Sequence, residues 1–168
     1  MNVANHKQMS LACALVLFAA LLPHGVAQDH SAPQKTTQQA GVQYVNKEYG
    51  FHFALPGSWK DYKVVADNWS GSDDSSNATE KGPIVVLRNP KWTKDHPTQD
   101  IPIMIFTLAQ WKKIDNEEMS VSAAPVGPSE LGRNSKYVFA LPPRYDFGDG
   151  EAKEEVYAIL KGNPLQPL

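Results

Sequence analysis

The residues that could catalyse a reaction are few, and their spacing does not match a nucleophile motif. A serine nucleophile is often exposed by a Gly-x-Ser-x-Gly turn between a strand and a helix. The nearest segment, residues 127–132 (GPSELG), is one residue too long and follows no strong apolar strand. This pattern is typical of a polar turn between two strands, so we predict no catalytic residue here.

Histidine and carboxylate spacing does not predict a metal site. His30, His52 and His96 form neither an H-x-H nor an H-E-x-x-H pair. His96 and Asp100 are four residues apart, but a proline between them argues against a shared helical face. The acidic run 73–77 (DDSSN) lacks the glycine and the distal glutamate of a calcium-binding EF-hand loop. We therefore predict no metal and no cofactor.

Large planar side chains in polar loops are the best binding candidates. Trp92 lies in the polar segment 89–97, and Arg144 and Tyr145 follow Pro142-Pro143. Aromatic and arginine side chains often anchor binding sites, and loops often carry function. We predict Trp92, Arg144 and Tyr145 as binding residues, provided that both rings are exposed and both loops share one rim of the sheet. The alternative is that the rings fold back and cover that rim.

The N-terminus has the pattern of a secretory signal peptide. Lys7 precedes the apolar run Leu11–Leu22, and small residues at Gly25 and Ala27 suit a signal peptidase. The run is short for a membrane span, so cleavage after Ala27 is favoured over an uncleaved anchor. The single cysteine, Cys13, lies before this position, which would leave no disulfide or thiolate metal site. We expect export to the periplasm or the extracellular space.

The rest of the chain has the size and charge of one ordinary globular domain. Residues 28–41 are polar without apolar periodicity, which predicts a flexible leader, and residues 42–168 then form a single domain. The chain has 16 basic and 18 acidic residues and a net charge of −2, without a basic block, which argues against nucleic acid as a partner. No second apolar run follows, so we expect no membrane span after cleavage.

Alternating residues predict a hairpin at the start of the domain. Residues 42–45 and 49–55 alternate around a turn at 46–48, which places Phe51, Phe53 and Leu55 on one strand face. The segments expected next are a helical turn with capping-box spacing at 58–61, a strand at 62–66, a polar loop at 70–81 and a strand with both faces covered at 83–88.

The second half of the domain predicts two helices and two further strands. Thr107 and Gln110 have capping-box spacing for a helix that runs to about Met119, with Trp111 on its apolar face. The other expected segments are an irregular connection at 89–100, strands at 101–106 and 136–141, a weakly extended piece at 121–126, a turn region at 129–135 and a helix at 151–161. Strands joined by turns favour an antiparallel sheet with helices on its faces, so the predicted class is α+β.

The predicted hairpin also carries a family resemblance. Residues 44–59 (YVNKEYGFHFALPGSW) resemble the opening of PsbP-like domains, in which a YGFSF strand is followed by a proline and a tryptophan. Those domains also close with an amphipathic helix, as residues 151–161 do here. The resemblance implies a central antiparallel sheet between helices, an α/β/α sandwich, and membership among exported bacterial proteins. Members of the family are usually non-catalytic accessory or binding modules.

The sequence therefore favours one functional class and leaves two alternatives open. The favoured class is an exported, non-catalytic accessory or binding module whose partner is a protein or a small molecule of the cell envelope. One alternative is a small hydrolase outside the cytoplasm, with a site built from loops that no motif reveals. The other is a structural component of the envelope.

Overall fold

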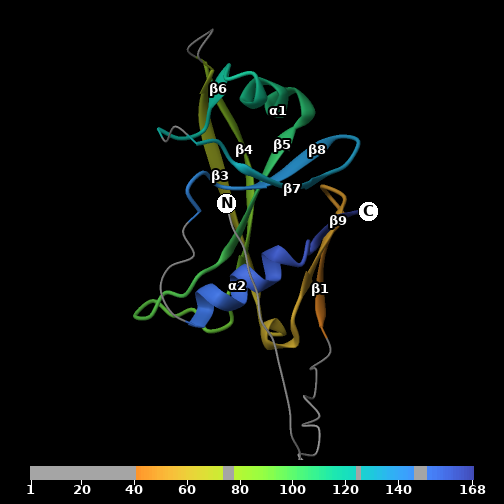
Figure 1. The fold of residues 1–168 in the computed structure, drawn as a ribbon, viewed down its shortest axis with the longest axis vertical. Coiled ribbons are helices and arrows are strands. Elements are labelled where there is room, and N and C mark those ends of the chain that lie inside the picture. Colours follow the sequence, from red (N-terminus) through yellow and green to blue (C-terminus); the bar gives the residue numbers. More distant parts are fainter. Residues whose placement is uncertain (1–40, 74–77, 124–125, 146–150) are drawn as a thin grey trace, which may run out of the picture. The chain divides into compact units, whose positions relative to one another are not determined.

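The computed structural model describes residues 41–73, 78–123, 126–145 and 151–168, and shows two antiparallel sheets and two short helices (Figure 1). The predicted signal peptide, its cleavage site and residues 28–40 of the leader lie outside the described residues. The elements are, in chain order, β1 (Val42–Asn46), β2 (Phe51–Leu55), a 3-10 turn (Gly57–Trp59), β3 (Lys63–Asp73), β4 (Thr79–Arg88), β5 (Ile101–Thr107), α1 (Leu108–Asp115), β6 (Met119–Ser120), β7 (Ser129–Arg133), β8 (Tyr137–Leu141), α2 (Glu151–Lys161) and β9 (Leu165–Pro167).

The strand order confirms the predicted α+β class. One sheet has the order β1-β2-β9 and the other the order β6-β3-β4-β5-β8-β7. All pairings between these described strands are antiparallel. No helix in the described part of the chain is long and apolar enough to cross a membrane.

The hairpin of β1 and β2 forms as predicted. Its register runs from Val42 opposite Leu55 to Asn46 opposite Phe51. Asn46 closes the turn because its Oδ1 accepts a hydrogen bond of 2.9 Å from the backbone N–H of Tyr49. Asparagine side chains often stabilise turns in this way.

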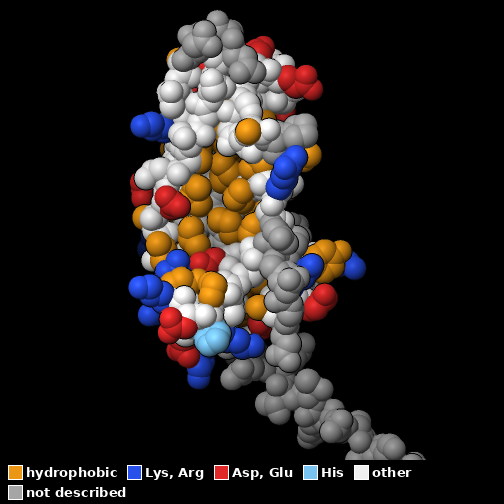
Figure 2. Space-filling model, turned by 90° about the vertical axis from the view of Figure 1, so that its left-hand side faces the viewer, with side chains coloured by type: hydrophobic (Ala, Val, Ile, Leu, Met, Phe, Trp, Pro, Cys, Tyr) orange, Lys and Arg blue, Asp and Glu red, His pale blue; other side chains and the backbone are white. Residues whose placement is uncertain are grey.

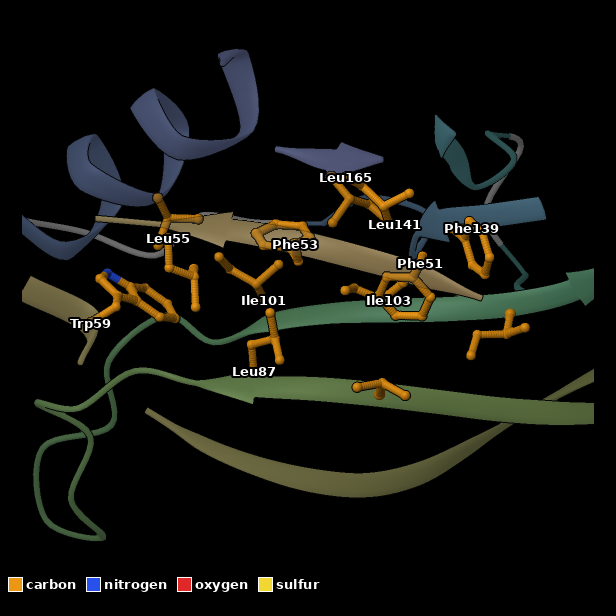
Figure 3. Close-up of a cluster of buried hydrophobic side chains, with 13 residues drawn as sticks. Phe51, Phe53, Leu55, Trp59, Leu87, Ile101, Ile103, Phe139, Leu141 and Leu165 are labelled. Carbon is orange, nitrogen blue, oxygen red and sulfur yellow. The ribbon is translucent and has the colours of Figure 1, made fainter. Parts of the chain in front are cut away.

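The main hydrophobic core lies between the two sheets. Phe51 and Phe53 are fully buried, and Figure 3 shows both side chains pointing from β2 toward the larger sheet. The ring of Phe51 lies 4.6 Å from that of Phe139 on β8, measured between centroids. Val156 of α2 is also fully buried in this cluster, so α2 and the three-stranded sheet cover the same face of the six-stranded sheet.

A second cluster lies on the opposite face of the six-stranded sheet. Along β5, Ile103 and Ile105 belong to the main core, whereas Met104 and Phe106 belong to the second cluster. This alternation is the period of two that a strand buried on both faces requires. Trp111 places α1 over Phe106, with ring centroids 5.5 Å apart. The predicted burial of Trp111 is thereby confirmed.

Two segments predicted as polar connections are strands. β3 extends to Asp73 and β4 begins at Thr79, so only residues 74–77 of the expected loop at 70–81 lie outside the described residues. The strands persist because the β3–β4 pairing continues to Ser72 opposite Thr79, and the ammonium of Lys113 contacts the carboxylates of Asp73 and Glu80 at 2.7 and 2.6 Å. Residues 129–133 form β7 rather than a turn, with a bulge between Glu130 and Gly132.

The helix boundaries differ in part from the prediction. The capping box of α1 is confirmed, since Thr107 Oγ1 accepts from Gln110 N and Gln110 Oε1 accepts from Thr107 N. The helix ends at Asp115 instead of near Met119, because Glu117 adopts a φ of 60° and Met119 pairs with β3. The capping box expected at 58–61 does not form. The segment is a 3-10 turn without a side-chain cap, and Ser58 Oγ donates to Glu155 instead.

Candidate functional site

One end of a face of the six-stranded sheet is apolar and incompletely covered. α1 covers one end of this face, and the half-buried side chains of Val65, Ile84, Val86 and Pro102 lie toward the other end. Val65 is directly opposite Val86, and Val86 is directly opposite Pro102. Figure 2 shows that hydrophobic side chains gather in a patch on one side of the molecule. We call these four residues the open face.

The next row of side chains on the same face is charged. Lys63 is opposite Arg88 in the register of β3 and β4. Side chains alternate between sheet faces, so Lys63 and Arg88 lie on the same face as Val65 and Val86. Arg88 Nε contacts Asp100 Oδ2 at 3.1 Å, and Asp100 Oδ1 accepts a bond of 2.9 Å from Asn89 N. The carboxylate of Asp100 therefore links the end of the loop at 89–100 to its beginning.

Trp92 lies against this charged row. The guanidinium carbon of Arg88 is 4.0 Å from the centroid of the Trp92 ring, a cation–π geometry. Asn89, which is 2% exposed, fixes the loop, since its Oδ1 accepts from Lys91 N and its carbonyl accepts from Trp92 N. Trp92 itself is half-buried. The loop thus holds the ring in one place without removing it from solvent.

A small hollow of about 160 Å³ lies beside the tryptophan. Its lining consists of Asp61, Lys63, Arg88, Asn89, Pro90 and Trp92. Two cationic side chains and one carboxylate therefore face a planar aromatic ring at the edge of an apolar surface. A guanidinium and an ammonium at such an edge can hold a carboxylate or a phosphate.

Tyr145 belongs to the fold more than to the site. Its hydroxyl donates to the backbone carbonyl of Asp100, and its ring packs against the main core. Burial raises the pKa of the Tyr145 hydroxyl above its ordinary value of 10.0. Its contact with Asp100 places the two predicted loops on one rim of the sheet, as expected. Trp92 and Tyr145 are both half-buried, so the substantial exposure that the prediction required is met only in part.

Arg144 is exposed and has a φ of 51°, in the left-handed region. It directly precedes Tyr145 in the chain and is not among the residues that line the hollow beside Trp92. The three predicted residues therefore do not form one site. Trp92 lines a hollow with Arg88 and Lys63, and Tyr145 contacts Asp100 at the rim of the sheet. A binding role of Arg144 stays a prediction.

Sequence reasoning missed Lys63, Arg88 and the open face. The run at 83–88 (PIVVLR) was predicted to have both faces covered, but Ile84 and Val86 are only half-buried. A continuous apolar run does not say which face lacks a covering element. The available signal was the position of Arg88, at the end of this run and directly before the loop that carries Trp92.

A second apolar hollow, of about 430 Å³, lies between β2 and α2. Leu55, Pro56, Ala158 and Ile159 line it, and Glu155 is its one charged residue. The carboxylate of Glu155 accepts from Ser58 Oγ. This hollow has apolar surface but lacks a fixed aromatic ring and a cation, so it offers less specificity than the open face.

The described residues contain no group of three or more His, Cys, Asp or Glu side chains that could hold a metal ion. The acidic run at 73–77 is described only at Asp73, which pairs with Lys113; its other four residues lie outside the described part of the chain.

Comparison with known proteins assigns no family to the chain. No protein-family model, no curated protein and no solved structure matches it. The geometry and chemistry of the site are therefore the basis for a functional proposal.

Proposed function

We propose that the chain is an exported, non-catalytic binding module for a small apolar ligand that carries one carboxylate or phosphate group. The observation that carries this proposal is the continuity of the open face with the charged row. The row Val65–Val86–Pro102 lies directly next to Lys63 and Arg88, and Arg88 is stacked on Trp92.

The open face can bind the apolar part of such a ligand. Neighbouring strands are about 4.8 Å apart, so the row across β3, β4 and β5 is about 10 Å long. Valine and proline side chains have little rotamer freedom to lose when a ligand covers them. Each 100 Å² of apolar surface removed from water would contribute about 2.5 kcal/mol to binding.

The charged row can bind the anionic end. A guanidinium has five N–H donors, and Asp100 accepts from Nε of Arg88, so other donors remain for a ligand oxygen. The Trp92 ring and Asp100 hold the guanidinium in place before a ligand arrives. Such preorganisation reduces the entropy lost on binding.

We also propose that the fold is of the PsbP-like type, an α/β/α sandwich. Two features support this. The resembling segment at 44–59 forms β1, β2 and the following 3-10 turn, and the two helices contribute to hydrophobic clusters on opposite faces of the six-stranded sheet. An experimental structure should superpose on PsbP-like domains with the large sheet and both helices in register. Superposition of the hairpin alone would contradict the proposal.

Export is part of the proposed function and is tested separately. The small residues at Gly25 and Ala27 predict that mass spectrometry of the protein from an envelope or culture fraction finds a new N-terminus close to Gln28. Recovery of the chain only with Met1 intact and bound to membranes would contradict export with cleavage.

The ligand proposal is tested with four probes that share one alkyl chain: dodecanoate, dodecyl phosphate, dodecylamine and dodecanol, each below its micelle concentration. Isothermal titration should show the two anions binding at least about tenfold more tightly than the amine. Val86→Ser should weaken all four probes, whereas Arg88→Gln should weaken only the anions. Val45→Ser, at an exposed valine of β1, is the matched control. Equal binding of anions and amine, or no binding of any probe, would contradict the proposal.

A further inference from the structure

β3 is an edge strand along most of its length. It pairs with β4 from Lys63 to Ser72, but with β6 only at Ser72 and Asp73. On its outer side, residues 63–70 therefore have no partner strand in the part of the chain that the structure describes. Val64 is 50% exposed, and Ala66 is also exposed. A free strand edge is a template for pairing with another chain.

The backbone of β3 shows which residues turn outward. The N–H of Asp73 donates to the carbonyl of Ala78, on the β4 side, whereas the N–H of Asn68 donates to Oδ1 of Asp67 at 2.8 Å. Backbone groups alternate between the two sides of a strand, so the even-numbered residues from 64 to 70 present theirs to the free edge. Ser72 follows the same parity, and it is the position where β6 pairs.

One register makes this edge complementary to itself. When two copies of β3 run antiparallel about a two-fold axis at Val65, Lys63 lies opposite Asp67 of the second copy. By symmetry, the same contact occurs a second time. Val64 then lies opposite Ala66 of the second copy, and Val65 lies opposite Val65 of the second copy. This register pairs even residues with even residues, as the outward backbone groups require. A two-fold axis at Asp67 would instead place two carboxylates opposite each other, which is unfavourable.

The same register continues the open face across both copies. Val65 is the outermost member of the row Val65–Val86–Pro102. Contact between two Val65 residues would join two such rows into one apolar surface over both sheets. A contact of this kind uses the same patch on both partners, so it closes as a dimer and does not propagate.

We infer that a second copy of this chain docks on the free edge of β3, in the antiparallel register that pairs Lys63 with Asp67. The inference concerns the assembly of the protein and does not depend on the identity of a ligand. The paired segment is short, so the dimer should be weak, with a dissociation constant on the order of 10–100 µM.

The test is analytical sedimentation of the full chain, from about 10 µM to 1 mM. Wild-type protein should show a monomer–dimer equilibrium. Lys63→Asp and Asp67→Lys each place like charges opposite each other twice, so each variant alone should dimerise about tenfold more weakly. Lys47→Asp, in the exposed turn after β1, changes net charge as much as Lys63→Asp does and should leave dimerisation unchanged.

Mixing the two single variants distinguishes this register from other contacts. At positions 63 and 67, the Lys63→Asp variant carries two carboxylates and the Asp67→Lys variant carries two ammonium groups. Opposite charges then face each other twice across the strand pair, so a heterodimer should form with about wild-type affinity. The double variant Lys63→Asp/Asp67→Lys should also dimerise with itself.

Thermal unfolding verifies that each variant is folded before its sedimentation is compared with that of the wild type. A monomeric wild type at the highest concentration, single variants that dimerise normally, or a mixture that stays monomeric would each overturn the inference.

Discussion

Arg88 connects three parts of the candidate site at the scale of single residues. Its Nε contacts Asp100, its guanidinium lies over Trp92, and its position in β4 places it beside Lys63. A cation–π contact at a partly exposed site contributes about 0.5–1 kcal/mol. The contact is therefore too weak to be a principal source of stability, and its main effect is to position two planar groups.

Trp92→Ala should weaken binding of dodecanoate by about tenfold and shift the melting temperature by only a few degrees. The reason is that Trp92 is half-buried in a surface loop and belongs to neither hydrophobic cluster. The matched control is Trp111→Ala, since Trp111 is 7% exposed in the second cluster and its loss should cost about 3–5 kcal/mol. Equal losses of stability in the two variants would show that Trp92 is a core residue.

At the scale of elements, Lys113 fastens α1 to the ends of β3 and β4. Its ammonium contacts Asp73 and Glu80, which lie on two neighbouring strands. Both hydrogen bonds raise the pKa of Lys113, and its bond to Glu80 lowers the pKa of that carboxyl. The helix is short, so this contact and the burial of Trp111 hold it more than its intrinsic helicity does.

The lowered pKa of Glu80 sets the pH dependence of this contact. A carboxyl whose pKa is lower in the folded state stabilises the protein above its unfolded pKa of about 4.5, and this stability is lost as the pH falls through the folded value. Lys113→Met should therefore lower the melting temperature at pH 7 and reduce its fall on acidification. Lys112→Met, one residue earlier and exposed, should change neither. Parallel acid profiles for wild type and Lys113→Met would contradict this role.

β9 should be essential for the stability of the folded domain, although it has only three residues. Leu165 is 2% exposed and lies opposite Phe53 of β2, so Leu165→Ala should cost about 2–5 kcal/mol in chemical unfolding. The control is Leu168→Ala at the exposed end of the same segment, which should cost less than about 0.5 kcal/mol. A small effect at Leu165 would mean that the C-terminal segment is not part of the core.

At the scale of the whole molecule, local periodicity predicted some elements and missed others for identifiable reasons. The hairpin at 42–55, the strand at 101–106 and the helix at 151–161 have strong alternation or amphipathic spacing, and all three form. β7 and β9 were missed because Gly132 and the prolines around Leu165 are typical of turns. β9 pairs with β2, which is distant in the sequence and which no local pattern reveals, whereas β7 pairs with β8, the strand directly after it.

The candidate site was predictable only in part for the same reason. The loop with Trp92 stood out because it has a large aromatic ring in a polar segment. Its neighbours Lys63 and Arg88 come together through the register of β3 and β4, which depends on pairing across the hairpin. The exposure of Val86 depends on where α1 lies, since Gln110 and Lys113 contact Lys81 and Glu80, at the other end of β4 from Val86.

The most direct test of the binding proposal is a two-dimensional NMR titration of the folded domain with dodecanoate. The largest shifts should occur at Val65, Val86, Arg88 and the indole N–H of Trp92, because the alkyl chain is expected on the open face with its carboxylate at Arg88. Shifts should be small around Ala158 and Ile159, which line the hollow between β2 and α2. Largest shifts at that second hollow, with the Trp92 indole unmoved, would contradict the account.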